Sequence, residues 1–312
     1  MNSKTKGYIL GALGAASYGT NPIFAIPLFR DGMDAASVLF FRYLFALPVI
    51  ALMMQLRGRS FAPRKTSHLM AALLMGILMA LSSLLLFVSY DYMGAGVAST
   101  LLFLYPIMVA LIMCICFKEK AGILTFISIL VALAGVFLIS FKPGGEIVSL
   151  TGTVLVFASA FSYAVYLVCV NEWQPLKKMP TLKLTFYVIL IGAMMFGIMA
   201  IAGGGISVPS KPHMWFNIIC LAVLPTAFSF YCTTHAITLI GSTPTAILGA
   251  LEPLTAVALG VVVLAEPITV RIAWGFVLVI SGVSLIVAKD SVTHALLRIR
   301  KMLPKKNLNS TK

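Results

Sequence analysis

The sequence predicts an all-α membrane protein of ten transmembrane helices, arranged as two inverted five-helix repeats. Three observations lead to this prediction: long apolar runs, an uneven distribution of Lys and Arg, and an internal repeat. Of the 312 residues, 60% are apolar and only 10% are charged, and the mean hydropathy is +1.03. A soluble domain needs more charge to cover its surface. The runs are unbroken rather than alternating every second residue, so they predict helices and exclude a β-barrel.

Ten apolar runs, bounded by charges, Gly or Pro, give the expected helices. A bilayer core of roughly 30 Å is crossed by about 20 helical residues, and the chain has room for ten such crossings with short loops. The runs cover residues 7–29, 35–56, 67–91, 95–117, 122–141, 149–171, 181–202, 213–239, 243–264 and 268–289. The boundary with the weakest signal separates 213–239 from 243–264, where Gly241, Ser242, Thr243 and Pro244 stand without a charge.

The distribution of Lys and Arg predicts the orientation of these helices. The two ends of the chain and the loops on their side carry 18 basic residues, whereas the opposite loops carry 4. Short cytoplasmic loops are rich in Lys and Arg, so both termini are expected in the cytoplasm. The net charge of +14 is therefore a topology signal rather than a sign of nucleic-acid binding. The basic tail 290–312 either lies on anionic lipid or is solvated.

An internal repeat divides the chain into two similar halves. Residues 94–139 align without a gap on 241–286 at an offset of 147, with shared Pro106/Pro253 and Glu119/Glu266. An offset of 145 relates the earlier helices of the halves, where Ser17-Tyr18 matches Ser162-Tyr163. The predicted units are 1–148, 149–289 and the tail. Because each half holds five helices, an odd number, the second half is expected to be inverted, which is the geometry of alternating access.

These residues also carry a family resemblance. Ser17-Tyr18-Gly19-Thr20-Asn21, Phe41-Arg42-Tyr43 and the two Pro-x12-Glu segments resemble the EamA family of the drug/metabolite transporter superfamily. The resemblance implies a ten-helix inner-membrane permease, commonly an exporter of amino acids or other metabolites. Where the family often has Trp before Gly in the first helix, this chain has Tyr18, which reshapes the expected cavity.

Glu252 is the main candidate for chemistry inside the membrane. It lies nine residues into its helix, roughly 14 Å deep, where an unpaired carboxylate is costly. It is therefore expected to face the interior, either as a substrate-amine or proton site, or as a neutral carboxyl bonded to a backbone carbonyl released by Pro253. Its counterpart in the other half is Tyr105.

Arg42 has two interpretations that the sequence does not separate. Its forked guanidinium suits a substrate carboxylate. Alternatively it is a structural charge paired with Asp31, Asp34 or Asp91, which are expected at the same side of the membrane. If Arg42 and Glu252 face one cavity, an amino acid fits both charges.

Polar and aromatic residues at helical spacing mark the expected cavity faces. The candidates for substrate binding on these faces are Tyr18, Asn21, Ser162, Tyr163 and Tyr166. Polar stripes in lipid also serve as contacts between helices, so each of these residues has a purely structural alternative.

Hinges and proton transfer have their own candidates. Pro106 and Pro253 are expected to kink their helices and act as hinges or gates. Asp91 and His235 are further candidates for proton coupling beside Glu252.

The function expected from this pattern is secondary transport of a small metabolite around a midplane cavity, without a cofactor, a metal or a nucleotide. An enzyme is disfavoured because the sequence contains no Gly-x4-Gly-Lys-Ser/Thr loop, His-Glu-x2-His or Gly-x-Ser-x-Gly motif. A facilitative channel is the second alternative, although no ring of charges or repeated carbonyl filter is visible. The expected partners are the small-molecule substrate and the lipid bilayer.

Overall fold

The computed structural model describes residues 2–62, 65–93, 98, 101–119, 122–140, 149–264 and 269–302, and all regular secondary structure within these ranges is helical. The first half contains α1 (Ser3–Tyr18), α2 (Asn21–Arg30), α3 (Ala35–Leu56), α4 (Thr66–Ser89), α6 (Tyr105–Phe117) and α7 (Ile123–Ser140). The second half contains α8 (Leu150–Glu172), α9 (Gln174–Lys177), α10 (Thr181–Ala202), α11 (Pro212–Ala222), the π-helix η1 (Val223–Phe228), α12 (Ser229–Ile240), α13 (Ser242–Leu248), α14 (Leu251–Leu264) and α15 (Val270–Met302).

Six helical stretches within these ranges are long and apolar enough to cross a membrane. They are Ser3–Arg30, Ala35–Leu56, Thr66–Ser89, Leu150–Glu172, Thr181–Ala202 and Pro212–Ile240. Each overlaps one of the expected spans. The other four expected spans coincide with shorter helices, α6, α7, the pair α13–α14 and the first part of α15, so the count of ten stays a prediction.

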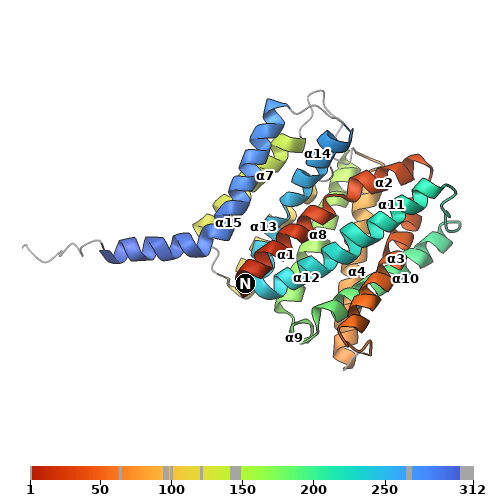
Figure 1. Cartoon of the computed structure of the whole chain (residues 1–312), viewed down its shortest axis with the longest axis horizontal. Helices are drawn as coiled ribbons and strands as arrows, with labels where there is room; N and C mark the ends of the chain where they lie inside the picture. The colour runs from red at the N-terminus through yellow and green to blue at the C-terminus, as the bar shows by residue number, and fades with distance from the viewer. Residues whose placement is uncertain are drawn as a thin grey trace, which may run out of the picture.

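The outer surface of the bundle is apolar. Large side chains such as Leu130, Met194 and Trp274 are each at least 60% exposed. Exposure of this kind across many helices is typical of a protein solvated by lipid. The C-terminal part of α15 projects away from the bundle (Figure 1), but its side chains from 287 onward, and the chain from 303, lie outside the described residues, so the expected contact of the tail with lipid stays a prediction.

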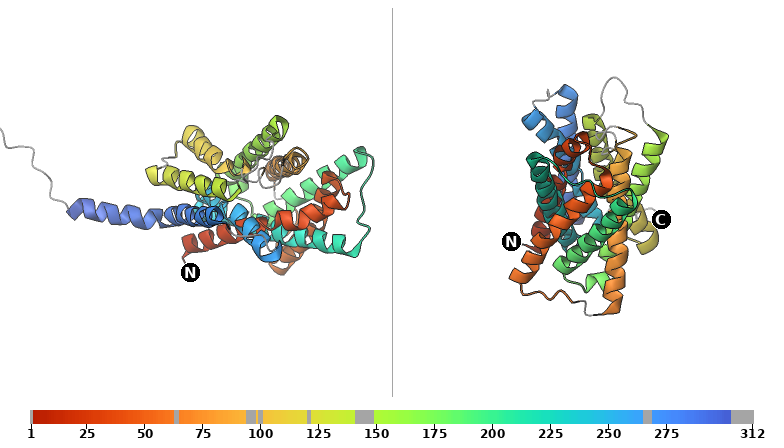
Figure 2. Two further views of the ribbon diagram at one scale, coloured as in Figure 1. Left: turned by 90° about the horizontal axis from the view of Figure 1, so that it is seen from above. Right: turned by 90° about the vertical axis from the view of Figure 1, so that its right-hand side faces the viewer.

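The strongest packing partners follow a regular rule. Helix α3 packs on α10, α7 on α15, α1 on α12 and α4 on α8 (Figures 1 and 2). In the five-plus-five scheme, α3 corresponds to α10, α7 to α15, α1 to α8 and α4 to α12. Exchanging the halves therefore maps the pairs α3–α10 and α7–α15 onto themselves and maps the pair α1–α12 onto the pair α4–α8. The pattern of contacts is therefore unchanged by the exchange, as expected if a two-fold axis relates the halves.

The contact between α7 and α15 shows the same reciprocity at the level of atoms. A methyl group on Gly135 would lie 2.7 Å from the backbone nitrogen of Val279, and one on Gly282 would lie 2.8 Å from the backbone nitrogen of Ala132. Gly135 and Gly282 are equivalent at an offset of 147, and so are Ala132 and Val279. The two backbones therefore touch through equivalent glycines, a close approach that only glycine permits.

A surface link ties the turn after α2 to the start of α11. Lys211 Nζ and His213 Nε2 lie 2.7 Å from the two carboxylate oxygens of Asp31. Hydrogen bonds from Lys211 first, and then from His213, hold the pKa of Asp31 below its ordinary value. Asp31 is therefore engaged with these two residues rather than with Arg42.

Replacing Asp31 with Asn is expected to lower the melting temperature slightly at neutral pH, because exposed ion pairs contribute little. Since the folded-state pKa of Asp31 is lowered, its contribution is present above the ordinary Asp pKa of about 3.9 and is lost as the pH falls through the lowered value. Thermal unfolding of the two proteins between pH 7 and pH 3 tests this: the difference between them should shrink toward pH 3. A difference that grows toward low pH would contradict the assignment.

Candidate functional site

Two interrupted helices cross in the interior of the bundle. Helix α1 ends at Tyr18 and α2 begins at Asn21, while α13 ends at Leu248 and α14 begins at Leu251. The breaks touch each other, because a methyl group on Gly19 would overlap the backbone oxygen of Glu252 and lie 2.9 Å from Thr255 Cβ. The polar backbone ends of both breaks are thus brought to one place, the arrangement that transporters use to bind substrates at mid-membrane.

Proline starts the helix that follows each break. Pro22 stands in the first turn of α2, Pro106 in that of α6 and Pro253 in that of α14. The sequence predicted that Pro106 and Pro253 kink continuous helices. Instead they begin half-helices after a break, a position where proline is favoured because its missing N–H would have no partner in any case. Their role as hinges stays a prediction.

Replacing Gly19 with Ala is expected to disturb this crossing. The added methyl group meets backbone atoms of α14 that cannot turn aside, and overpacking of this kind costs about 1–3 kcal/mol. We expect a lower melting temperature together with reduced transport. Gly122→Ala is the matched control, since among the described residues no atom beyond its chain neighbours lies within 4 Å of a methyl group there. An unchanged melting temperature and transport rate in Gly19→Ala would show that the two breaks are not in contact.

Glu252 and Tyr105 meet beside this crossing. Both side chains line the same cavity, where the Tyr105 hydroxyl is a hydrogen-bond donor and the Glu252 carboxylate an acceptor. The same hydroxyl packs against the bare backbone of Gly249, where a methyl group would overlap it. Equivalent positions of the two repeats therefore border one cavity, and we call Glu252 and Tyr105 its polar unit.

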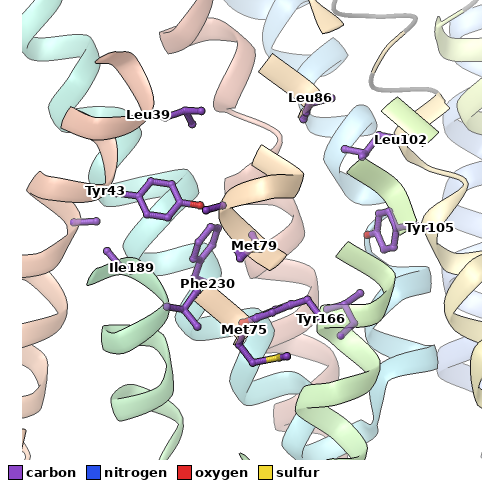
Figure 3. Close-up of a cluster of buried hydrophobic side chains, with 14 of the residues drawn as sticks. Leu39, Tyr43, Met75, Met79, Leu86, Leu102, Tyr105, Tyr166, Ile189 and Phe230 are labelled. Carbon is purple, nitrogen blue, oxygen red and sulfur yellow. The ribbon is translucent and has the colours of Figure 1, made fainter. Parts of the chain in front are cut away.

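Tyrosine rings connect this unit to α8 and, through Thr234, to α12. The ring centroids of Tyr105 and Tyr163 are 4.8 Å apart, and those of Tyr163 and Tyr166 are 6.2 Å apart. The Tyr166 and Thr234 hydroxyls lie 3.2 Å apart. Figure 3 shows Tyr105 and Tyr166 among the buried side chains of the interior.

Two small cavities border this cluster. A cavity of about 30 Å³ is lined by Tyr18, Asn21, Tyr105 and Glu252, together with Tyr90 and Phe103. A cavity of about 10 Å³ is lined by Tyr163, Tyr166, Ser229 and Thr234. Tyr18 lines both cavities. The larger holds one or two water molecules, which means that the interior is closed around its polar groups in this conformation.

Arg42 is fully buried behind the wall of the larger cavity. Its guanidinium donates from Nη1 to Asn21 Oδ1 at 3.2 Å, from Nη2 to the Pro225 oxygen at 3.1 Å, and from Nε to Thr226 Oγ1. The Tyr18 and Phe87 rings lie 5.5 and 5.8 Å from its central carbon. Arg42 thus orients Asn21, which lines the cavity, and its positive charge lies just behind that wall.

The π-helix η1 makes these bonds available. Pro225 has no N–H, so the wider turn leaves backbone oxygens that need other donors. Thr226 Oγ1 donates to the Leu221 oxygen at 2.7 Å, and Arg42 donates to the Pro225 oxygen. The π-helical turn η1 therefore needs Arg42 as a donor for its free backbone oxygen, and the buried Arg42 needs that oxygen as an acceptor.

Three other predicted residues lie away from the cavities. Ser162 Oγ donates to the Leu78 oxygen at 2.9 Å, so it joins α8 to α4. Asp91 is exposed in the turn after α4. His235 stacks on Tyr231 with ring centroids 5.8 Å apart, and its Nδ1 lies 3.4 Å from Thr181 Oγ1. Their roles in substrate binding or proton coupling stay predictions, and the structure does not bring them to the Glu252 cluster.

Some residues of the cluster were not predicted. Tyr90, Phe103 and Phe230 line the cavities, and Phe230 also packs on Tyr43 with ring centroids 5.9 Å apart (Figure 3). Phe230 directly follows Ser229, a polar residue of the same helix, and this neighbour is the feature of the sequence that could have pointed to it. Tyr90 and Phe103 flank helix ends, where periodicity carries no information.

Comparisons with known proteins agree with this architecture. A family model described as the EamA-like transporter family matches residues 5–141 and 150–288. Uncharacterized transporter sll1319 of Synechocystis sp. is 29% identical over 264 residues, which cover 80% of this chain and 78% of that protein. Uncharacterized transporter YdfC of Bacillus subtilis is 24% identical over 214 residues, covering 68% and 69%. A solved structure, described only as "Crystal structure of protein", superposes with a TM-score of 0.78 at 16% identity, covering 89% of this chain and 97% of that one, which shows a shared fold.

Proposed function

Because this chain belongs to the EamA-like transporter family, we propose that it is a secondary carrier that exports small metabolites such as amino acids across the bacterial inner membrane. The family and its relatives make the chain a multi-pass membrane transporter rather than an enzyme. The substrate class, the direction and the mechanism are our proposal. Both termini are placed in the cytoplasm in this proposal, on the strength of the Lys and Arg distribution.

The observation that carries the proposal is the crossing of two interrupted helices at Glu252. Interrupted helices expose backbone carbonyls and N–H groups inside the membrane, which is tolerated where they line a binding cavity. Here the crossing adds an ionisable carboxyl, a phenol and the Asn21 amide to the same cavity. These groups can bind the polar parts of a small solute while the surrounding aromatic rings contact its apolar parts.

Alternating access fits the helix contacts, which stay the same when the two halves are exchanged. If the second half is inverted, exchanging the conformations of the halves turns a state open to one side into a state open to the other. The reciprocal contact of Gly135 and Gly282 supports an axis near α7 and α15, about which the other helices rock. Tyr105 and Glu252, which are equivalent and line one cavity, support a cavity near the same axis.

The closed interior favours a carrier over a facilitative channel. The cavities of about 30 and 10 Å³, both lined by Tyr18, are too small for a metabolite. A channel requires a continuous polar path in its conducting state. A carrier instead passes through a closed state, so we assign this conformation to the occluded stage of the cycle.

The charges of the site fit an amino acid. Glu252 supplies a partner for an ammonium group. Asn21, held by Arg42, supplies an amide for the carboxylate, and the Arg42 charge behind it favours a negative group at that end. Arg42 therefore acts on the substrate through Asn21 rather than by direct contact in this conformation.

Transport into proteoliposomes tests the proposal. Purified protein is reconstituted and offered a panel of radiolabelled amino acids and other small metabolites, with and without a pH gradient. We expect saturable uptake and accelerated exchange when unlabelled substrate is present inside. Flux that neither saturates nor shows counterflow would overturn the carrier mechanism and favour a channel.

A further inference from the structure

A basic pocket lies at the end of the bundle that carries α9, at the lower edge of Figure 1. Its volume is about 320 Å³, within the range of small-molecule sites. The loop after α3 and the first turn of α4 form one part of its wall, and the segment from α9 into the first turn of α10 forms the other. Both halves of the chain therefore contribute to it, and none of its described lining residues belongs to the Glu252 cluster.

The side chains that line this pocket are basic or neutral in the part of the chain that the structure describes. Arg59, Lys178 and Lys183 carry positive charges, and His68 adds a ring N–H donor. The neutral lining residues are Gly58, Ser60, Ala62, Met179 and Pro180. The wall therefore presents several donors and positive charges to whatever enters.

The acidic residue nearest to this wall along the chain has other partners. Glu172 lies six positions before Lys178. Its Oε2 is 3.1 Å from Lys177 Nζ, and its Oε1 accepts a hydrogen bond from Asn171 Nδ2 at 2.8 Å. Glu172 also lines a different pocket, together with Asn171. Its charge is therefore matched by Lys177 and is not directed at the basic pocket.

The burial of Lys183 sets this pocket apart from an ordinary basic surface. The residue is 6% exposed, and its Nζ donates to the Ala62 oxygen at 2.6 Å. An excess of basic residues on one side of the membrane explains exposed ones such as Arg59 and Lys178, but it does not require a buried ammonium group. Burying a charge is costly, and an anion in the pocket would lower that cost.

Two helices begin at this pocket with features that favour an anion. The N-cap residues are Lys65 for α4 and Pro180 for α10, and neither forms a side-chain cap. The first turns contain no acidic residue, and each instead places a basic residue, His68 or Lys183, in the pocket wall. The N-terminal end of a helix dipole is positive, so it disfavours cations and favours anions. An anion here would interact favourably with both helix ends and with the basic side chains.

The loop between α3 and α4 is held in place without a ligand. Tyr187 Oη donates to the Phe61 oxygen at 2.6 Å, and the Phe61 ring packs on Phe186 with ring centroids 5.3 Å apart. The Ala62 N–H donates to Ser60 Oγ at 3.2 Å. The pocket is therefore pre-organised, which lowers the entropic cost of binding.

We propose that this pocket binds a phosphate group, carried either by an anionic lipid or by a small soluble phosphate compound. The forked guanidinium of Arg59 matches two phosphate oxygens, and the lysines add point charges. Basic pockets between membrane helices bind lipid head groups in this way. The exposed apolar side chains of Leu69 and Met70 follow His68 on α4, so an acyl chain could lie beside the pocket. Binding there does not depend on the proposed transport.

Isothermal titration calorimetry on the full-length protein tests the site, in dodecyl maltoside and a chloride buffer, which contain no phosphate. The soluble probe is sn-glycerol 3-phosphate and the lipid probe is dioctanoyl phosphatidylglycerol; glycerol and dioctanoylglycerol are their counterparts without phosphate. We expect saturable binding of a phosphate probe and none of its counterpart. Binding of the lipid probe alone identifies a lipid head group, whereas binding of the soluble probe identifies a free phosphate compound. No saturable binding of either probe, or equal affinity for a counterpart, would overturn the proposal.

Two neighbouring lysines distinguish a specific site from a generally basic surface. Lys178→Gln and Arg59→Gln should each weaken binding of the phosphate probe about tenfold, as expected for loss of one hydrogen bond to a charged group. Lys177→Gln is the matched control, because it removes the same charge one position away, but Lys177 pairs with Glu172 and does not line the pocket. Equal weakening by Lys177→Gln and Lys178→Gln would show general attraction to the surface and refute the site.

Lys183→Met should have the largest effect, a loss of about a hundredfold in affinity, because it keeps the length of the side chain and removes the buried charge. Lys183 also holds the Ala62 oxygen, so the melting temperature is measured first and binding is measured well below it. Full affinity in folded Lys183→Met would contradict the proposal. Should this variant fail to fold, the exposed residues Arg59 and Lys178 decide the outcome by themselves.

Discussion

Glu252→Gln is expected to lower transport by about a hundredfold while leaving the protein folded. The substitution keeps the volume of the side chain but removes its ability to ionise, so the cavity can no longer pair with an ammonium group or carry a proton. Loss of a buried charge–charge hydrogen bond of about 1.5–3 kcal/mol corresponds to a reduction of roughly ten- to a hundredfold, and the loss of proton binding adds to it. Any dependence of the rate on a pH gradient should disappear with it.

Reconstituted transport and thermal unfolding together test this result. Glu252→Asp is the matched control, because it keeps the carboxyl group and should retain part of the activity. The melting temperature of Glu252→Gln should not fall, since removing a charge from an apolar interior removes a desolvation cost. Transport of Glu252→Gln at the wild-type rate, with unchanged pH dependence, would show that Glu252 is structural.

Arg42→Gln is expected to have the largest effect on stability. The substitution removes the donors to Asn21, Thr226 and the Pro225 oxygen, three acceptors that come from two distant segments. Breaking a buried charged network in this way typically costs about 3–5 kcal/mol. Arg42→Lys keeps the charge but loses the forked geometry, so its stability should lie between those of Arg42→Gln and the wild type.

Thermal unfolding in detergent measures the effect. Arg57→Gln is the control, because Arg57 is exposed and its Nη1 donates to Tyr231 Oη at 2.9 Å. Exposed contacts of this kind contribute about 1 kcal/mol or less. If Arg42→Gln unfolds at the same temperature as Arg57→Gln, then Arg42 does not hold η1 and the α1–α2 break together.

The six long helices were largely predictable from the sequence, for a physical reason. Lipid forces each spanning segment to be apolar and helical, so composition and charge locate the ends of these helices to within four residues. The repeat offset also identified Tyr105 as the counterpart of Glu252, and in the structure the two side chains line one cavity.

The breaks within helices were not predictable in the same way. Proline is compatible both with a kink and with the first turn of a new helix, and only packing decides between them. Whether the first helix breaks at Gly19 depends on the close approach of the α14 backbone, which lies more than 200 positions further along the chain.

The candidate site could be predicted as a set of residue types, but not as a set of partners. Periodicity placed Ser162, Tyr163 and Tyr166 on one face of a helix. In the structure Tyr163 and Tyr166 line a cavity, whereas the Ser162 hydroxyl donates a hydrogen bond to α4. Arg42 was expected to meet a carboxylate. Its partners in η1 depend on a π-helical turn, and sequence spacing gives no signal for that turn.

The reciprocal glycine contact between α7 and α15 has a consequence for how the chain holds together. Surfaces that touch through equivalent residues are self-complementary, like the isologous interface of a symmetric dimer. The two halves therefore behave as covalently tethered protomers, and the linker of residues 141–149 raises their effective concentration far above that of free partners. Either half, made as a separate polypeptide, would carry a face able to bind a second copy of itself.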